Sequence, residues 1–375
     1  MGRIIIVGDL FPTEQNFSCF SKGDVDSLFG KDIVSLFVKS DYRICNLEGA
    51  LTDHPDKCRK TGPVKVAATS AINAYKKLGI NCCMLANNHV TDGGHQGVLD
   101  TMRTLGNAGI GYIGVGRNAD DIKHSFIKEI DGLKTGFYNV CETMYNKPTK
   151  TTAGVWLYDE YIVCRDLELL KKKCDYLIVI YHGGIEKFPY PSPEMRKRFF
   201  RMADNGADVI LAQHTHCVGC EERYNGSYLL YGQGDFLLKN FAPGLTDTGL
   251  IIEIVVAGGK VDIKKHMVKS VENLFVRYNE HPDFSGLEER SAKLHDVGYV
   301  NQQLQKFCDG ELRLYLKAFK SPSKLRLRLS RFFPKAHKKW LYNYNERDLM
   351  FILHTLRSEQ NRETVIIGIE HFLNM

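Results

Sequence analysis

The chain has 375 residues, of which 43% are hydrophobic and 25% are charged, so it can hold one large globular domain or a large domain with a smaller one. Its net charge of +6 does not by itself indicate nucleic-acid binding, and we find no apolar run of membrane-spanning length. The eleven cysteines lack the spacing of a disulfide framework, which indicates reduced and mostly buried thiols.

The first half of the chain alternates predicted strands and helices. Apolar, β-branched runs predict the strands, and apolar residues at helical spacing predict the helices. Segment 141–161 has no clear pattern, and segment 50–66 is polar and loop-like. We predict strands at 3–7, 41–45, 80–84 and 112–115, helices at 31–39, 69–78 and 95–107, and a hairpin at 126–140 that turns at Asp131-Gly132.

The second half continues this alternation and then changes character. We predict helices at 166–174 and 193–205, strands at 175–181 and 207–212, and an all-β segment at 219–271. After residue 272, glycine is scarce and apolar residues recur periodically, which predicts helices at 286–319, 345–357 and 363–372. The expected organisation is therefore an α/β domain at 1–271 and a mainly helical, basic region at 272–375.

Polar residues follow five of the predicted strands. Because the ends of strands in a layered sheet converge on one rim, these side chains are expected to lie together. Carboxylates, an amide oxygen and imidazoles are a metal-binding set by ligand type, and they fit Mn, Fe or Zn without choosing among them. The clusters are Asp9, then Asn46 and Glu48, then Asn88 and His89, then His182, and last His214 and His216.

These clusters, in this order, resemble a known family. The motifs are Gly8-Asp9, Asn46-Leu47-Glu48, Asn87-Asn88-His89 with Asp92 and Gly94, His182-Gly183-Gly184 with Glu186, His214-x-His216, and Tyr231-Gly232-Gln233-Gly234-Asp235-Phe236. They resemble the CapA family of capsule biosynthesis, a branch of the calcineurin-like metallophosphoesterases, over about residues 3 to 270. The resemblance implies a four-layer α/β/β/α sandwich with a dinuclear metal site.

The resemblance also implies a role for each residue. Asp9 and His216 would bind the first metal, Asn88, His182 and His214 the second, and Glu48 would bridge them. His89 would protonate the leaving group, because a histidine near its ordinary pKa can donate a proton at neutral pH. Asn46, Glu186 and Asp92 are further candidates, with Asp92 expected to orient its neighbours rather than to bind a metal.

The chain departs from the usual metallophosphoesterase pattern near its first aspartate. Phe11 stands where a metal-binding histidine is usual, so the first metal would lack one ligand. Glu48 replaces an aspartate, and Asp235 stands where the family commonly has asparagine. One or two divalent ions are therefore expected.

Two classes of function follow from the resemblance. The first is a metal-dependent hydrolase that cleaves a phosphoester, or alternatively a gamma-glutamyl amide, during capsule or surface-polymer production. The second is an accessory or transferase component of a polymer assembly complex. Expected partners are an anionic polymer, phosphoester or glycan substrate and capsule assembly proteins, with no nucleic acid.

The location and the basic run complete the expectations. The chain starts inside its first predicted strand and is rich in cysteine, which favours a cytoplasmic protein, with the inner membrane surface as an alternative. Segment 317–339 contains nine basic residues and no acidic one, and it is either a solvated face or a contact with a membrane surface or anionic glycan.

Overall fold

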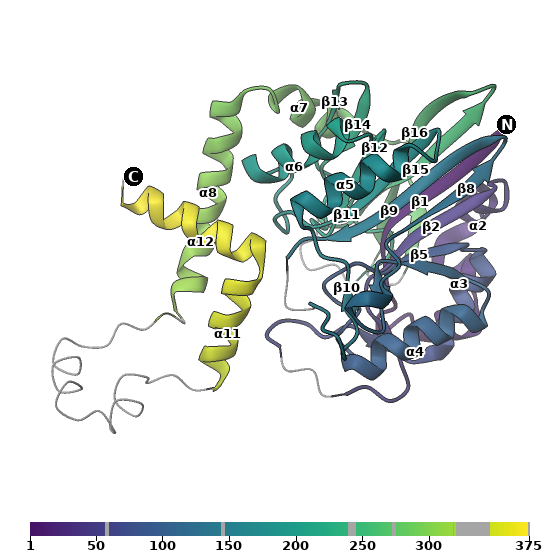
Figure 1. Ribbon diagram of the computed structural model, residues 1–375, viewed down its shortest axis with the longest axis horizontal. Helices are drawn as coiled ribbons and strands as arrows, with labels where there is room; N and C mark the ends of the chain where they lie inside the picture. Colours follow the sequence, from purple (N-terminus) through teal and green to yellow (C-terminus); the bar gives the residue numbers. More distant parts are fainter. Residues whose placement is uncertain are drawn as a thin grey trace. The chain divides into compact units, whose positions relative to one another are not determined.

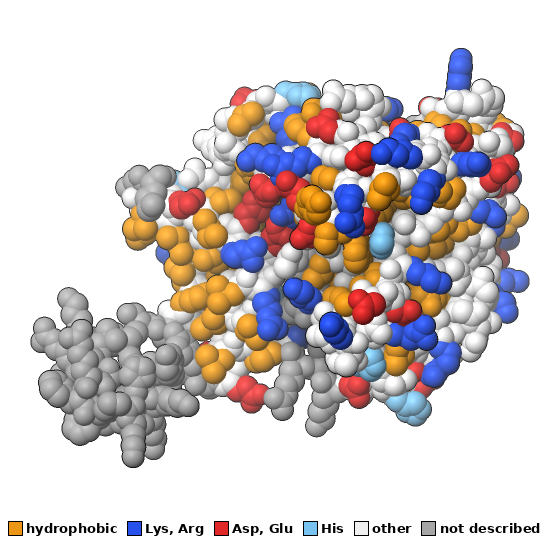
Figure 2. Space-filling view, viewed as in Figure 1, with side chains coloured by type: hydrophobic (Ala, Val, Ile, Leu, Met, Phe, Trp, Pro, Cys, Tyr) orange, Lys and Arg blue, Asp and Glu red, His pale blue; other side chains and the backbone are white. Residues whose placement is uncertain are grey.

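The computed structural model describes residues 1–56, 60–143, 147–238, 245–271, 275–317, 319 and 346–373. The chain forms two compact units, one of Met1–Cys58 and Val64–Val300 and the other of Arg59–Pro63 and Asn301–Met375. The division predicted at residue 271 stays a prediction. Figure 2 shows basic and acidic side chains mixed with apolar ones over the face that it draws, in keeping with the small net charge.

The first sheet carries the N-terminal strand near its centre. Within the described residues it has seven strands in the order β17-β16-β15-β1-β2-β5-β6 (Figure 1). β1, β2, β5 and β6 are parallel, whereas β15, β16 and β17 add an antiparallel side. The bounds are β1 Gly2–Leu10, β2 Tyr42–Leu47, β5 Cys82–Met84, β6 Gly111–Ile113, β15 Thr248–Ala257, β16 Lys260–Val271 and β17 Phe275–Tyr278.

The second sheet is built from the middle of the chain. Its order is β13-β14-β12-β11-β9-β8, and β9, β11, β12 and β14 are parallel in it. The predicted hairpin at 126–140 is confirmed as β8 and β9. The bounds are β8 Ser125–Ile130, β9 Leu133–Cys141, β11 Tyr176–His182, β12 Val209–Gln213, β13 Glu221–Tyr224 and β14 Ser227–Leu230.

The two sheets face each other across an apolar core. Successive side chains of a strand point to opposite faces, so β1 serves two cores at once. Ile4 and Ile6 pack between the sheets with Ile180 and Leu211, whereas the intervening Ile5 lies in the core on the other face of the first sheet. This alternation fixes which face of each strand is buried, and it also fixes the direction of the polar residues at the strand ends.

Helices cover the outer face of each sheet. Buried side chains of α1, α2, α3 and α4 share one core with β1, and α5 and α6 pack on β9, β11 and β12 (Figure 1). The expected α/β/β/α sandwich is thereby confirmed. The bounds are α1 Phe17–Lys22, α2 Val25–Val38, α3 Ile72–Leu78, α4 Gly94–Asn107, α5 Glu160–Lys171 and α6 Pro193–Asp204.

Several short elements lie in segments for which neither a strand nor a helix was predicted. Segment 50–66, expected to be loop-like, holds two short parallel strands, β3 and β4. The unassigned segment 141–161 holds β10, which pairs with β7. The bounds are β3 Ala50–Leu51, β4 Val66–Ala67, β7 Val115–Gly116, β10 Gly154–Val155, and the 3-10 turns η1 Thr69–Ala71 and η2 Ala119–Asp121.

Two helix starts were predicted too late. The helix predicted at 166–174 begins at Glu160, because the Asp159 side chain accepts a hydrogen bond from the Ile162 amide and caps the first turn. The helix predicted at 31–39 begins at Val25, where Asp24 is the cap, and non-helical Gly30 interrupts the apolar pattern. The predicted helices at 69–78, 95–107 and 193–205 are confirmed within a residue or two, except that the first opens with η1.

The C-terminal part is helical where it is described. The helix predicted at 286–319 is two helices, α7 Ser285–Lys293 and α8 Val297–Leu316. α11 Glu346–Arg357 and α12 Glu359–Phe372 follow, with the Tyr315 hydroxyl of α8 donating to Asn361 of α12 at 2.7 Å. Among the described residues, none of the helices has both the length and the apolar character that a membrane span requires. The basic run expected at 317–339 lies, apart from Lys317 and Phe319, outside the described residues, and its role stays a prediction.

Candidate metal centre

A bulge in β1 directs the first acidic side chain into the site. The pairing of β1 with β2 shifts by one residue between Val7 and Asp9, which brings Asp9 opposite Asn46. Gly8 allows the backbone to pass close to the segment before Asp235, because a Cβ at Gly8 would lie 2.2 Å from the Gly234 carbonyl oxygen. Asp9 is thus buried at the end of its strand.

The other residues of the first sheet follow β2 and β5. Glu48 lies one residue after β2 and is fully buried. Asn87, Asn88 and His89 follow β5 and are buried as well. Asn87 fixes this loop, since its side-chain oxygen accepts the backbone amides of His89 and Val90 at 3.1 and 2.8 Å.

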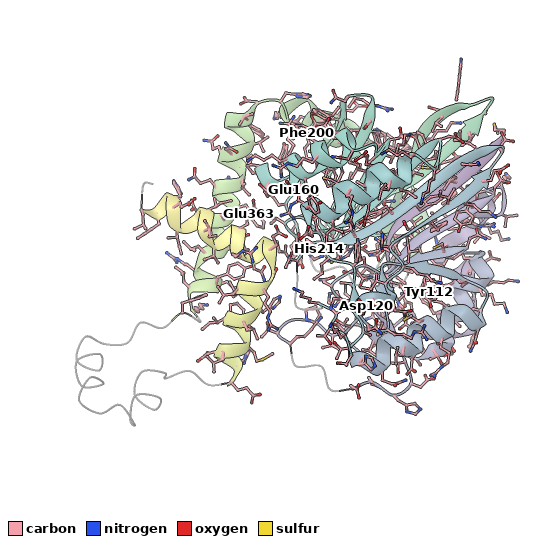
Figure 3. The ribbon with its side chains drawn as sticks, viewed as in Figure 1. Tyr112, Asp120, Glu160, Phe200, His214 and Glu363 are labelled. Atoms are coloured by element: carbon pink, nitrogen blue, oxygen red, sulfur yellow. The ribbon has the colours of Figure 1, made fainter. Side chains whose placement is uncertain are left out.

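The second sheet contributes three histidines. His182 is the last residue of β11, and His214 and His216 lie just beyond β12. Figure 3 labels His214 at the strand ends of the larger unit, and its side chain is fully buried. His214 and His216 have φ angles of 91° and 56°, a backbone region that non-glycine residues rarely occupy. Strain of this kind clusters at functional sites, where surrounding contacts hold it in place.

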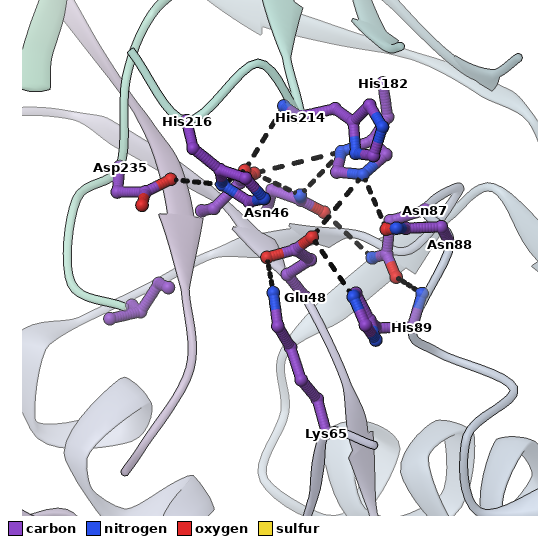
Figure 4. A network of polar contacts seen from close by, with 12 residues as sticks. Asn46, Glu48, Lys65, Asn87, Asn88, His89, His182, His214, His216 and Asp235 are labelled. Carbon is purple, nitrogen blue, oxygen red and sulfur yellow. Dashed lines mark hydrogen bonds and ion pairs between the residues drawn. The ribbon is translucent and has the colours of Figure 1, made fainter. Parts of the chain in front are cut away.

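Six residues named from the sequence come together at this rim (Figure 4). His182 Nδ1 lies 3.8 Å from Asp9 Oδ1, and His182 Nε2 lies 3.7 Å from Glu48 Oε1. One possible ligand atom from each of Glu48, His214 and His216 falls within 4.8 Å of the others, and the same holds for Asp9, His216 and Asp235. Asn88 completes the set, because its Oδ1 accepts from His182 Nε2–H at 3.0 Å.

The charges at the site are set by burial. Burial, with the neighbouring imidazoles, lowers the pKa of His182 well below its usual value, and burial lowers the pKa of His214 to about 3 despite the opposing charge of Glu186. These two imidazoles are therefore neutral at pH 7 and keep a lone pair for a cation. Burial also raises the pKa of Asp9, helped by the charges of Glu48 and Asp235, to about 8.

His216 behaves differently because it contacts carboxylates. Burial lowers its pKa, but the Asp235 and Glu48 carboxylates outweigh burial and raise it to about 10. Its Nδ1–H donates to Asp235 Oδ1 at 2.8 Å, which leaves Nε2 as the nitrogen available to a metal. Carboxylates that hold the far nitrogen of a metal-binding histidine orient the ring and raise its basicity.

His89 is held by a carboxylate in the same way. Its Nδ1 lies 2.6 Å from Asp92 Oδ2, and a carboxylate can only accept, so Nδ1 carries the proton. Nε2 then faces the centre, 4.0 Å from Glu48 Oε1. Asp92 is buried and also accepts the Lys65 backbone amide at 2.7 Å. Asp92 thus contacts both His89 and the Lys65 backbone, and its role in orienting its neighbours stays a prediction.

The remaining candidates differ in position. Asn46 donates to Asp9 Oδ1 at 2.5 Å and to His182 Nδ1 at 3.1 Å, so it links the two sheets. Glu186 is 40% exposed and lies 3.8 Å from His214 Nε2. Phe11 is buried in the apolar core and offers no ligand; a Cβ at Gly49 would lie 2.3 Å from its ring.

Lys65 and Asp235 take part in the centre and were not named from the sequence as site residues. Lys65 Nζ forms an ion pair with Glu48 Oε2 (Figure 4). A charged lysine does not bind metal ions, so a search of the sequence for metal-binding residue types does not find Lys65. Asp235 lay within the recognised Gly234-Asp235 motif and was noted only as a departure from asparagine. Asp235 lies next to His216 because two segments that are 19 residues apart along the chain approach each other in the fold.

The residues present fit a divalent cation. Glu48 Oε1 is buried and has no hydrogen-bond partner among the described residues, although the imidazoles of His89 and His182 lie about it. A buried carboxylate oxygen without a partner is costly unless a cation compensates it. Oxygen and nitrogen donors without thiolate suit Mn, Fe or Zn. The individual metal-binding roles, and the catalytic role of His89, stay predictions.

Comparison with known proteins agrees with the motifs. The family model described as "Bacterial capsule synthesis protein PGA_cap" matches residues 3–240, which is more than half of the chain. The chain is 27% identical over 191 residues to "Capsule biosynthesis protein CapA" of Bacillus anthracis, covering 49% of this chain and 46% of the relative. It is 26% identical over 250 residues to "PGA biosynthesis protein CapA" of Bacillus subtilis (strain 168), covering 65% of each.

Both matches span less than two thirds of the relative's own length. Among solved structures, the chain is similar to a "5'-nucleotidase precursor" from Thermus thermophilus, with a TM-score of 0.45 and 11% identity. That match covers 80% of this chain and 60% of the other.

Proposed function

Because the chain belongs to the PGA_cap family of bacterial capsule synthesis proteins, we propose that it is a metal-dependent hydrolase that cleaves a phosphoester during capsule or surface-polymer production. Its substrate on this proposal is an anionic polymer, a phosphoester or a glycan, and capsule assembly proteins are its partners. One or two ions of Mn, Fe or Zn would occupy the centre, held by Asp9, Glu48, Asn88, His182, His214 and His216.

One observation carries the proposal: a buried Glu48 oxygen without a hydrogen bond among the described residues faces His182, whose pKa burial keeps low. Lys65 pairs with the other oxygen of Glu48, so Oε1 and the neutral His182 are left together as donors that suit a cation. His182 donates its Nε2 proton to Asn88. His182, Asn88 and Glu48 would be among the residues that hold a divalent ion.

The chain's own residues supply the rest of the chemistry. A divalent ion bound here supplies Lewis acidity, which stabilises negative charge on an ester and makes water a better nucleophile. His89 would hold a proton on Nε2 and donate it to the departing oxygen, while Asp92 keeps the ring in that orientation. Asn87 keeps His89 at the rim by accepting its backbone amide.

A second candidate function has its own support. Phe11 supplies no ligand, and Lys65 already neutralises Glu48. The centre therefore has fewer metal-binding groups and less negative charge than a phosphoesterase site with two ions needs. A centre of this kind suits an accessory or transferase component of a polymer assembly complex, which binds anionic polymer with little hydrolysis. A gamma-glutamyl amide is the alternative bond, because a metal-assisted water attacks carbonyl carbon as well as phosphorus.

The discriminating experiment compares three proteins. Parent, His89→Ala and His295→Ala are assayed on aryl phosphate monoesters and diesters and on a gamma-glutamyl amide, with manganese added. His295 is exposed on the surface, so its variant controls for the loss of a histidine. On the proposal, His89→Ala loses activity by about 100-fold or more while keeping its metal, which is the usual size of a general-acid contribution.

Activity of parent and His295→Ala with loss in His89→Ala supports the hydrolase. Equal activity of all three proteins would show that His89 takes no part in the reaction. A parent that binds metal but turns over none of these substrates would overturn the hydrolase and favour the accessory component.

A further inference from the structure

Lys65 brings a fixed positive charge into the centre. The residue immediately precedes β4, and its side chain is 9% exposed. Its ammonium forms an ion pair with Glu48 Oε2, and Glu48 is fully buried. Figure 4 shows Lys65 approaching Glu48 from the side away from His214 and His216. The lysine therefore occupies part of the space around a predicted metal ligand.

The backbone holds Lys65 in this position from both sides. Its carbonyl accepts the Ala50 amide at 3.0 Å, and its own amide donates to Asp92 at 2.7 Å. Ala50 lies two residues after Glu48 and pairs with Val66 in the short β3–β4 ladder. The lysine is thereby fixed to the segment that carries Glu48 and to the carboxylate that contacts His89, which distinguishes it from a long surface lysine with many conformations.

The two carboxylate oxygens of Glu48 have different surroundings. Oε2 contacts the Lys65 ammonium, whereas Oε1 faces His182 Nε2 at 3.7 Å and has no hydrogen-bond partner among the described residues. A carboxylate that bridges two cations needs both cations within reach of its oxygens. Here one side of the carboxylate already has a cation, supplied by the protein.

The donors left for a second ion are also limited. Phe11 places a buried ring where a metal-binding side chain would be expected. His216 uses Nδ1–H to bind Asp235, so it has one nitrogen to offer and cannot serve two ions. Glu48, His214 and His216 form one compact set of buried donors, and the second set, Asp9, His216 and Asp235, shares His216 with it.

We propose that the Lys65 ammonium takes the place of one of the two ions of a phosphoesterase-type centre, so that the chain binds a single divalent ion at Glu48, His214 and His216. This inference rests on the proposed function only in that the centre binds a metal. The ammonium neutralises charge next to the ion without adding a second Lewis acid, and it is a ready partner for the anionic group of a substrate.

The number of bound ions tests the inference. Protein stripped with chelator is titrated with Mn(II), and stoichiometry is measured by calorimetry and by metal analysis after desalting. Electron paramagnetic resonance reports whether two Mn(II) ions are spin-coupled. The proteins are the parent, Lys65→Met, Lys65→Arg and the surface control Lys264→Met, which makes the same charge change at an exposed position of β16.

We expect one ion per chain and an uncoupled Mn(II) signal in the parent, in Lys65→Arg and in Lys264→Met. Lys65→Met frees Glu48 Oε2 and removes a repulsive charge next to the ion, so its ion should bind at least about tenfold more tightly than in the parent.

Two coupled ions in the parent would overturn the inference while leaving metal binding intact, and so would a folded Lys65→Met that binds Mn(II) as the parent does. No bound ion in the parent would overturn the proposed metal centre itself. If circular dichroism shows that Lys65→Met is unfolded, the parent and Lys65→Arg still decide the matter, because two ions in either contradict it.

Discussion

Breaking the Lys65–Glu48 ion pair should destabilise the metal-free protein strongly. Lys65 is 9% exposed and Glu48 is 0% exposed, so neither charge can turn to water when its partner is removed. Loss of one partner from a buried pair costs about 3–5 kcal/mol, because the remaining charge is left uncompensated. We expect a loss of this size in Lys65→Met and in Glu48→Gln, measured without metal.

The assay is urea unfolding of parent, both single variants and the double variant, each in excess chelator. In Lys65→Met/Glu48→Gln no buried charge is left alone, so its loss of unfolding free energy should be smaller than the sum of the two single losses by about 1–3 kcal/mol. Lys264→Met serves as the control for removing a lysine and should lie within about 0.5 kcal/mol of the parent, as surface changes usually do.

Two results would refute this reasoning. If each single variant unfolds within about 1 kcal/mol of the parent, the pair is solvated and of the kind found on surfaces. If the two losses simply add in the double variant, Lys65 and Glu48 act independently.

Three further predictions concern the rest of the centre. In the metal-free protein the pKa of Asp9 is raised to about 8 and that of His216 to about 10, so both hold protons at pH 7 that a cation must displace. Metal affinity should therefore rise from about pH 6 to about pH 9. Calorimetry in two buffers of different ionisation enthalpy measures the protons released on binding. Asp235→Asn removes the charge that does most to raise the pKa of His216. The metal affinity of this variant should therefore depend less steeply on pH above 7, and an unchanged pH dependence would show that Asp235 does not control the proton on His216. Gly8→Ala places a Cβ 2.2 Å from the Gly234 oxygen, and it should lower unfolding free energy by about 1–3 kcal/mol and reduce metal content.

The sandwich could be predicted because its signals are local and repeated. Each buried strand is an apolar run, and each ends in a polar cluster whose position follows from the convergence of strand ends. The alternation seen in Ile4, Ile5 and Ile6 is the consequence of a strand buried on both faces. The helix starts at Val25 and Glu160 were missed because capping by Asp24 and Asp159 outweighed a weaker apolar pattern.

The partners of the site residues could not be predicted in the same way. Lys65 comes from a segment that was expected to be a loop, and its contact with Glu48 depends on the pairing of β3 with β4. Asp235 lies beside His216 in a segment that passes close to Gly8, which has no Cβ to prevent this approach. Such contacts depend on tertiary packing between distant segments, for which residue type and spacing carry no signal.

The central claim, a divalent metal held at the rim of both sheets, is tested most directly by metal analysis of purified parent and of the His214→Ala/His216→Ala double variant after both are loaded with Mn, Fe or Zn and desalted. Circular dichroism and gel filtration verify that the variant remains folded. We expect about one bound ion per chain in the parent and a loss of nearly all of it in the variant. Equal and negligible metal in both folded proteins would show that this rim does not bind a metal.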